Sequence, residues 1–253
     1  MACHCHNGGF KLANSITNNI PWVLLGVNAP IREQTVIITR RAFTAALSLT
    51  GLSLLAGFSP LRLITEAMAQ GAADVAKPVS LPDMALGPAN APITITEYAS
   101  MTCPHCAAFN ADVFPKIKST YIDTGKIRYV FREFPLDIKA AAGSMLSRCI
   151  AKDDAGKYFA VTDLLFKQQS DWVMKNTTET LTRIGKQAGL TQQALDDCLK
   201  DQSLLDKIVA DQKFANEVLK VNSTPTFFLN GEMIKGETSF EEFDKRIKAL
   251  LKS

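Results

Sequence analysis

The sequence lacks any cluster of basic residues interleaved with aromatic ones, the pattern that is typical of nucleic-acid-binding surfaces. Its formal net charge is only +3, from 28 Lys and Arg against 25 Asp and Glu. This excess belongs to residues 1–69, which contain five basic and two acidic side chains. The rest of the chain has 23 basic and 23 acidic side chains and is therefore neutral. We therefore predict that the protein binds no nucleic acid.

The sequence also lacks a clear hydrophobic run of the ~20 residues that a membrane-spanning helix needs. Residues 42–58 form an apolar stretch of 17 residues that includes polar ones. Arg40 and Arg41 precede it, and Ala67-Met68-Ala69 follows it with the small-x-small spacing of a cleavage site. Paired arginines before a core rich in Ala, Gly, Ser and Thr resemble a twin-arginine signal.

We therefore predict that residues 1–69 are an export signal region and that the protein is periplasmic. A twin-arginine signal fits this region better than a general secretory signal. An uncleaved membrane anchor is the remaining alternative.

Cysteines are few, but two of the six stand close together at a change of pattern. Residues 93–98 alternate like a strand, and Cys103-Pro104-His105-Cys106 then opens a helical pattern. This order places Cys103 in the first turn of a helix, where unpaired N–H groups and the helix dipole stabilise a thiolate. Cys103 is therefore the predicted nucleophile, Cys106 the inner resolving thiol, and Pro104 a suitable first helical residue.

Metal ligands are scarce, since the chain has only three histidines. Residues 3–6 alternate Cys and His, but four consecutive residues cannot all reach one tetrahedral ion. A zinc site at the C-x-x-C motif would need two further ligands, and Cys149 and Cys198 have no His neighbours. Haem attachment is excluded because Ala107 stands where C-x-x-C-H requires histidine. We predict no metal and no cofactor.

The pattern along the rest of the chain predicts an α/β architecture. Residues 70–92 hold four prolines and should form a linker and extended lead-in. A βαβ unit follows, with strands at 93–98 and 127–133 and a helix that kinks or restarts near Pro115. Residues 138–220 show helical spacing with almost no strand signal. A ββα unit closes the chain, with strands at 226–229 and 232–234, an Asn230-Gly231 turn, and a helix at 239–251.

This order resembles the DsbA family of thioredoxin-fold disulfide oxidoreductases over about residues 84–251. The resemblance is carried by C-P-H-C at residues 103–106 and T-P-T-F-F-L-N-G at residues 224–231, together with residues 98–102 and 131–136. It implies a thioredoxin-like domain, with βαβ and ββα halves, from residues 93–137 and 221–253. Residues 138–220 would then be an inserted all-helical domain.

The resemblance also implies a function and roles for particular residues. The protein would be an exported oxidoreductase that donates the Cys103–Cys106 disulfide through a mixed disulfide at Cys103. His105 would stabilise the Cys103 thiolate and make the site oxidising. Thr224-Pro225 would be a cis peptide beside the sulfurs, with Thr224 backbone atoms free to pair with an extended substrate. Glu97 would be a buried acid that exchanges a proton with the inner thiol, although a solvated strand carboxylate fits the pattern nearly as well.

The implied partners are unfolded or newly exported proteins that contain cysteine, and a DsbB-like, quinone-linked membrane protein that reoxidises the site. A periplasmic reductase or isomerase is one alternative function. A copper-binding chaperone that uses Cys103, His105 and Cys106 is another.

Cys149 and Cys198 both fall in the helical stretch. An exported protein meets an oxidising compartment, in which paired cysteines tend to bond, so we predict a disulfide between them. Closing a loop of this length would stabilise the fold by about 4 kcal/mol in the chain-entropy model. Two buried free thiols are the alternative.

Overall fold

The computed structural model describes residues 71, 73–77, 79–236 and 238–252. The predicted export signal, with its arginine pair and cleavage pattern, lies outside the described residues. Within them, no helix combines the length and the apolar character that crossing a bilayer requires.

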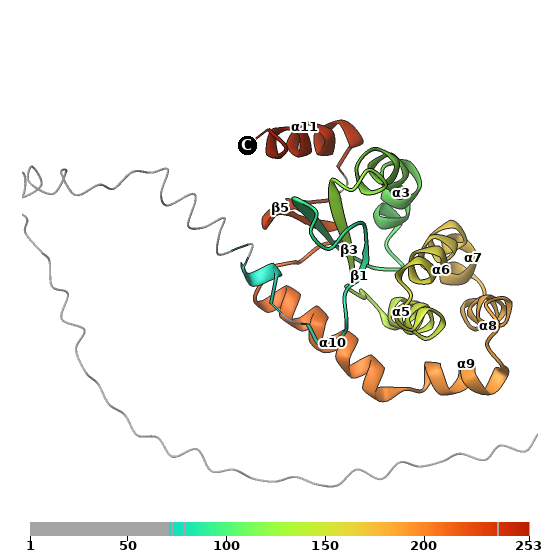
Figure 1. Cartoon of the computed structure of the whole chain (residues 1–253). Helices are drawn as coiled ribbons and strands as arrows, with labels where there is room; N and C mark the ends of the chain where they lie inside the picture. The colour runs from blue at the N-terminus through green and yellow to red at the C-terminus, as the bar shows by residue number, and fades with distance from the viewer. Residues whose placement is uncertain (1–70, 72, 78, 237, 253) are drawn as a thin grey trace, which may run out of the picture. The chain divides into compact units, whose positions relative to one another are not determined.

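The sheet confirms the predicted thioredoxin-like fold (Figure 1). Its spatial order is β1-β3-β2-β4-β5, with β1 at Met84–Leu86, β2 at Ile93–Ala99, β3 at Ile127–Glu133, β4 at Thr226–Leu229 and β5 at Glu232–Lys235. The β2 and β3 strands are parallel, as a βαβ unit requires, and the other neighbours are antiparallel.

The first strand corrects the expectation for residues 70–92, which was an extended lead-in without a regular element. Met84–Leu86 pairs antiparallel with the outer edge of β3. Pro82 and Pro88 flank this strand and do not interrupt it. An edge strand tolerates nearby prolines because one of its two sides makes no hydrogen bonds to another strand.

The helices have the following bounds: α3 Pro104–Asp112, α4 Phe114–Ile117, the π-helical turn η2 Lys118–Ile122, α5 Ile138–Ala151, α6 Ala155–Lys167, α7 Gln169–Met174, α8 Thr177–Gln187, α9 Gln192–Leu199, α10 Gln202–Glu217 and α11 Phe240–Leu250. The expected break near Pro115 is present between α3 and α4. Five helices begin at a side chain that accepts a hydrogen bond from the backbone of the first turn, namely Asp137, Asp154, Thr191, Asp201 and Ser239.

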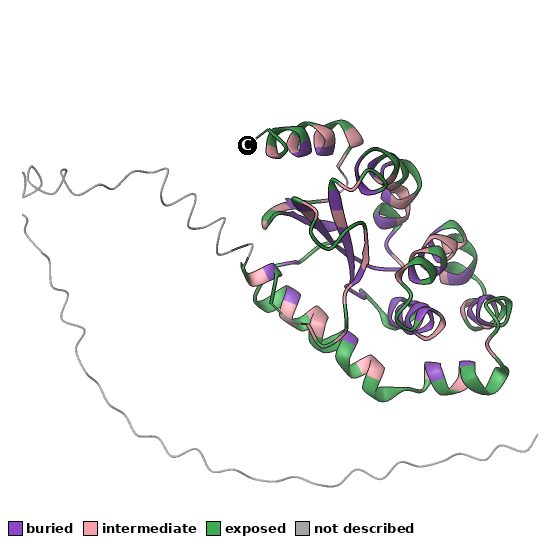
Figure 2. Cartoon of the chain, in the orientation of Figure 1, coloured by how far each residue is buried: buried purple, intermediate pink, exposed green. Residues whose placement is uncertain are grey.

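The two faces of the sheet are covered by different elements. On one face Ile95, Tyr129 and Phe227 pack with Phe109 of α3 and Phe243 of α11. On the other face Tyr98 of β2 and Phe228 of β4 belong to a third cluster. The same cluster contains Ala215 of α10, Leu219 just after α10 and Val75 before β1. Buried residues accordingly follow the strands and the inner sides of the helices (Figure 2).

Helices of the 138–220 segment share a core with the start of α3. Leu146, Tyr158 and Trp172 belong to the same buried cluster as Cys103 and Cys106. The helical segment therefore forms one wall of the region around the two cysteines.

Candidate active site

Cys103 lies where β2 has ended and α3 begins. It is the N-cap of α3, with φ −78° and ψ 121°, and Pro104 is in the first helical turn. The sequence placed Cys103 inside that turn, so the sulfur is one position earlier than expected. An N-cap side chain faces the unpaired N–H groups of the helix, so the electrostatic argument for a thiolate still applies.

The Cys103 thiol is brought to a residue 121 positions away in the chain. Its Sγ donates to the backbone oxygen of Thr224 at 3.3 Å. The Thr224-Pro225 peptide bond is cis. The β2–β4 pairing aligns Tyr98 with Thr226, which explains how the loop before β4 reaches the end of β2.

Both cysteines of the motif are free thiols, and their proton affinities differ strongly. A hydrogen bond from the Cys106 thiol, with others from Thr224 and from the backbone N–H groups of Cys106 and His105, lowers the pKa of Cys103 to about 5 against the opposing effect of burial. Burial and the neighbouring Cys103 and Glu97 raise the pKa of Cys106 far above its ordinary value. At neutral pH the outer sulfur is therefore an anion and the inner one a thiol.

His105 and Pro104 are exposed at the start of α3. His105 contributes to the low pKa of Cys103 through its backbone N–H, which is the smallest of the named contributions. The effect of its imidazole on the sulfur stays a prediction.

Thr224 presents a second polar group beside the cysteines. Thr224 is 8% exposed, and in this structure its Oγ1 has no hydrogen-bond partner. When Cys103 is ionised, a hydrogen bond from Thr224 to its sulfur lowers the pKa of Cys103. A buried hydroxyl without another partner is available to the Cys103 thiolate or to a bound chain.

Glu97 is buried below the cysteines on β2, and only 3% of it is exposed. The hydroxyl of Tyr129 on β3 donates to its Oε2 at 2.5 Å, while its Oε1 has no partner. Burial, opposed by the Tyr129 hydrogen bond and reinforced by the charge of Cys103, raises the pKa of Glu97 to about 8. The structure thus excludes the solvated carboxylate that the sequence left open.

Several contacts at the site had no signal in the sequence. Gln169 of α7 donates from Nε2 to the backbone oxygens of Met101 and Cys103, each at 3.0 Å. The Thr102 hydroxyl donates to Asp137 at 2.7 Å. Tyr129 looked like an ordinary strand residue. These residues are found only once α7, β3 and the loop before α5 are placed beside the motif.

Exposed apolar side chains lie beside this region. Leu136 is 54% exposed, Ile138 72% and Met174 79%. Leu136 N–H donates to the Ser100 hydroxyl, and Lys139 Nζ donates to the backbone oxygen of Val173 at 2.6 Å, so the three side chains belong to segments that meet near the β2–α3 loop.

Metal binding has no support in the described part of the chain. There, no group of three or more His, Cys, Asp or Glu side chains is placed to hold an ion. The copper alternative therefore lacks a ligand set among these residues.

The second cysteine pair is joined in the structure by a disulfide between Cys149 of α5 and Cys198 of α9, whose Cα atoms are 6.1 Å apart. This bond lies within the helical segment.

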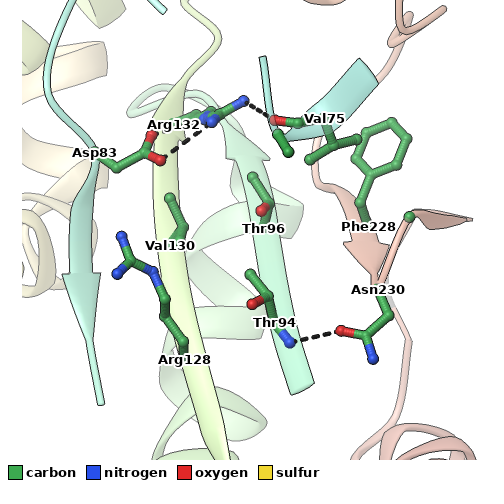
Figure 3. Close-up of a pocket in the computed structure, with 11 residues that line it drawn as sticks. Val75, Asp83, Thr94, Thr96, Arg128, Val130, Arg132, Phe228 and Asn230 are labelled. Carbon is green, nitrogen blue, oxygen red and sulfur yellow. Dashed lines mark hydrogen bonds and ion pairs between the residues drawn. The ribbon is translucent and has the colours of Figure 1, made fainter. Parts of the chain in front are cut away.

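A cavity of about 400 Å³ lies away from the cysteines, against the sheet face that bears Thr94, Thr96 and Val130 (Figure 3). Arg132 at its rim donates to Asp83 and to the backbone oxygen of Val75. None of the cavity's lining residues belongs to the cysteine motif or to the Thr224 loop.

Comparison with known proteins agrees with this geometry. The family model described as thioredoxin matches residues 80–249. A protein of Rickettsia bellii named as a protein-disulfide oxidoreductase is 39% identical over 150 residues, which are 59% of this chain and 57% of that protein. Disulfide bond formation protein D of Bacillus subtilis is 28% identical over 171 residues, 66% of this chain and 76% of that one. The match thus spans little more than half the length of the rickettsial relative.

Among solved structures, that of Wolbachia pipientis alpha-DsbA1 is 36% identical with a TM-score of 0.64, and the match covers 70% of this chain and 94% of that one. A mixed five-stranded sheet with a C-x-x-C motif at the start of the helix that follows its second strand defines a thioredoxin-fold protein. The chain belongs to the thioredoxin family and, within it, to the DsbA group.

Proposed function

We propose that the protein is an exported thiol:disulfide oxidoreductase that donates the Cys103–Cys106 disulfide to other proteins. A substrate thiolate attacks Cys103 Sγ, the Cys103–Cys106 bond breaks, and Cys106 leaves and takes up a proton. A second substrate thiolate then attacks the substrate sulfur of the mixed disulfide, and Cys103 leaves as a thiolate. Two electrons pass from the substrate to the site, and the substrate gains a disulfide.

The observation that carries this proposal is the difference between the two thiols. A Cys103 pKa of about 5 makes this sulfur a good leaving group and stabilises the dithiol form at neutral pH. Stabilising the reduced form favours loss of the disulfide, so the site acts as an oxidant.

The surroundings of Cys103 suit an extended, unfolded partner. The Thr224 loop offers backbone groups for strand-like pairing. The exposed side chains of Leu136, Ile138 and Met174 offer apolar contact that does not demand a particular sequence. We propose unfolded or newly exported cysteine-containing proteins as substrates, and a DsbB-like quinone-linked membrane protein as the oxidant that restores the disulfide.

The burial of Glu97 and its electrostatic interaction with both active cysteines support a role as a proton relay. With a pKa of about 8 it is protonated at neutral pH and can give a proton to Cys106 as that sulfur leaves. In the reverse direction its carboxylate accepts the proton from Cys106.

Export to the periplasm through the predicted twin-arginine signal completes the proposal. Such a compartment would also favour the Cys149–Cys198 disulfide, to which we assign a structural role.

The decisive experiment follows the ultraviolet absorbance of the thiolate in the reduced protein against pH, with Cys103→Ser as the matched control. The expected midpoint lies near pH 5 and is absent in the variant. A midpoint near the ordinary cysteine value would contradict the proposal. The redox equilibrium with glutathione then separates an oxidase from a reductase or isomerase, because a reductase has a far lower potential.

A further inference from the structure

Two strands place a tyrosine and a glutamate together beneath the active cysteines. The parallel register aligns Ile95 of β2 with Tyr129 of β3. Because side chains alternate along a strand, Glu97 projects from the same face as Ile95, next to Tyr129. The Tyr129 ring is held in place by Phe114, with 4.9 Å between ring centroids, and Tyr129 is only 1% exposed.

The two oxygens of the Glu97 carboxyl group have different surroundings. Oε2 accepts the Tyr129 hydrogen bond at 2.5 Å, whereas Oε1 is buried without a partner. The titratable groups that act on Glu97 are Tyr129 on β3 and the thiols of Cys103 and Cys106 at the start of α3. Its register partner on β4, Phe227, is apolar. Oε1 is therefore the carboxyl oxygen left for exchange with a thiol.

We propose that Tyr129 is the positioning residue of the proton relay: it holds Oε2 of Glu97, leaves Oε1 for Cys106, and sets the pH at which the carboxyl group accepts a proton. This inference rests on the proposed function and adds a residue to it. A tyrosine suits the role because burial and the charge of Glu97 raise its own pKa well above the ordinary value, so that it remains a hydrogen-bond donor throughout the working range.

The step in which Tyr129 acts is the resolution of a mixed disulfide. The Cys106 thiol passes its proton to Glu97 Oε1, and the Cys106 thiolate attacks Cys103 Sγ. The Cys103–Cys106 bond forms, the bond from Cys103 to the partner sulfur breaks, and the partner leaves as a thiolate. The Tyr129 hydrogen bond stabilises the Glu97 carboxylate and so opposes the effect of burial on its pKa.

The test uses reduced protein and glutathione disulfide. Cys103 attacks the reagent to give glutathionylated protein, and Cys106 then releases glutathione. Acid quenching followed by mass spectrometry measures the resolution rate against pH. In Tyr129→Phe the half-maximal pH should rise by about one unit, because a hydrogen bond to the charged carboxylate has been removed.

The chain supplies a matched control. Tyr158 is also fully buried and donates to a glutamate, Glu133, at 2.6 Å. Tyr158→Phe removes the same hydroxyl group from the same type of contact, and the half-maximal pH should not move. In a Glu97→Gln background, adding Tyr129→Phe should cause no further shift.

The possible results test the role of Tyr129 separately from the proposed disulfide exchange. An unchanged pH profile in Tyr129→Phe, or an equal shift in Tyr158→Phe, would overturn the role of Tyr129 while disulfide exchange continues. If Glu97→Gln leaves the profile unaltered, the relay and its positioning residue both fail. If the protein exchanges no disulfides, the proposed function fails. The carbon-13 shift of the Glu97 carboxyl group then still decides whether Tyr129→Phe raises its pKa.

Discussion

Two regions of this protein contain the same reactive residue types and use them differently. Each has a pair of cysteines, a buried glutamate and a buried tyrosine that donates to it. In the first region, around Cys103 and Cys106, Glu97 has no basic partner among the described residues and one unpaired oxygen. In the second, Glu133 is bound by Arg148 through both of its oxygens, at 2.5 and 2.7 Å, and the nearby Cys149 is in a disulfide.

The difference shows that burial alone does not make a carboxyl group reactive. Both glutamates are on neighbouring parallel strands, and both are at most 5% exposed. Arg148 supplies a charge and two donors to Glu133, and its own pKa is raised by that carboxylate although burial opposes the effect. Glu97 receives one neutral donor, so it holds a proton that it can exchange.

Arg148→Met should remove the largest amount of stability, about 4 kcal/mol, because it leaves the Glu133 carboxylate buried without its counter-charge. Denaturant unfolding measures the loss, and the thiolate titration of Cys103 should be unchanged in the folded variant. A loss below 1 kcal/mol would show that Glu133 does not depend on its ion pair.

Replacing the second cysteine pair with Cys149→Ala and Cys198→Ala should cost about 3 kcal/mol, because the unfolded chain loses a cross-link across a sequence separation of 49. This cost is below the chain-entropy value of about 4 kcal/mol because residual structure in the unfolded chain reduces the effect of a cross-link. The redox potential of Cys103–Cys106 should stay the same. Mass spectrometry of the unmodified protein supplies the control, and alkylation of Cys149 and Cys198 without reductant would contradict the structural role.

Glu97→Gln should raise the free energy of unfolding at high pH, whereas the two preceding replacements lower it. The unfolded carboxyl group ionises near 4.5 and the folded one near 8, so wild-type stability is full below 4.5 and falls as the pH rises through 8. This shift corresponds to on the order of 5 kcal/mol. Part of it is offset because a neutral amide is a weaker acceptor for the Tyr129 hydroxyl than a carboxylate and buries an NH2 group, which leaves a gain for the variant of about 2 kcal/mol at pH 9. Unfolding at pH 4 and pH 9 tests this, and equal stabilities of variant and wild type at pH 9 would contradict it.

The smallest effect concerns the two redox forms of the wild type. Cys103 is ionised above about pH 5 in the folded dithiol but only near pH 9 when unfolded, so its contribution is full above pH 9 and is lost as the pH falls through 5. After a discount for solvent screening, the reduced form should gain about 1 kcal/mol on the oxidised form between pH 5 and pH 8. Thermal unfolding of both forms against pH measures this difference, and a difference that does not change between pH 5 and pH 8 would contradict the prediction.

Much of the fold could be predicted from the sequence. Alternation and breaker residues placed β2 to β5 and α11 within one or two residues, and Pro115 marked the break after α3. The short strand β1 was missed because the prolines around it suggested an irregular segment. Its pairing with β3 depends on partners 43 to 47 residues away. Short edge strands have too few residues for a local signal.

Part of the active site could likewise be predicted from the sequence, and part could not. Local spacing was enough to single out Cys103 and Cys106 and to suggest Pro104 as the opening of the helix. The sequence did not predict which contact lowers the pKa of Cys103 most. It pointed to the His105 imidazole, whereas the largest contribution comes from the hydrogen bond of Cys106. A hydrogen bond between two side chains depends on orientations that only the folded backbone determines.

The residues of the chain define the chemistry that is available to this protein: two thiols of a C-x-x-C motif at a helix start, a threonine and proline before a strand, and glutamates on two strands. Which of these groups react depends on the folded chain. It brought Thr224 to Cys103 across 121 positions, gave Arg148 to Glu133, and left Glu97 with Tyr129. The physical reason is that desolvation and charge interactions depend on distances in space, which the chain sets only when it folds.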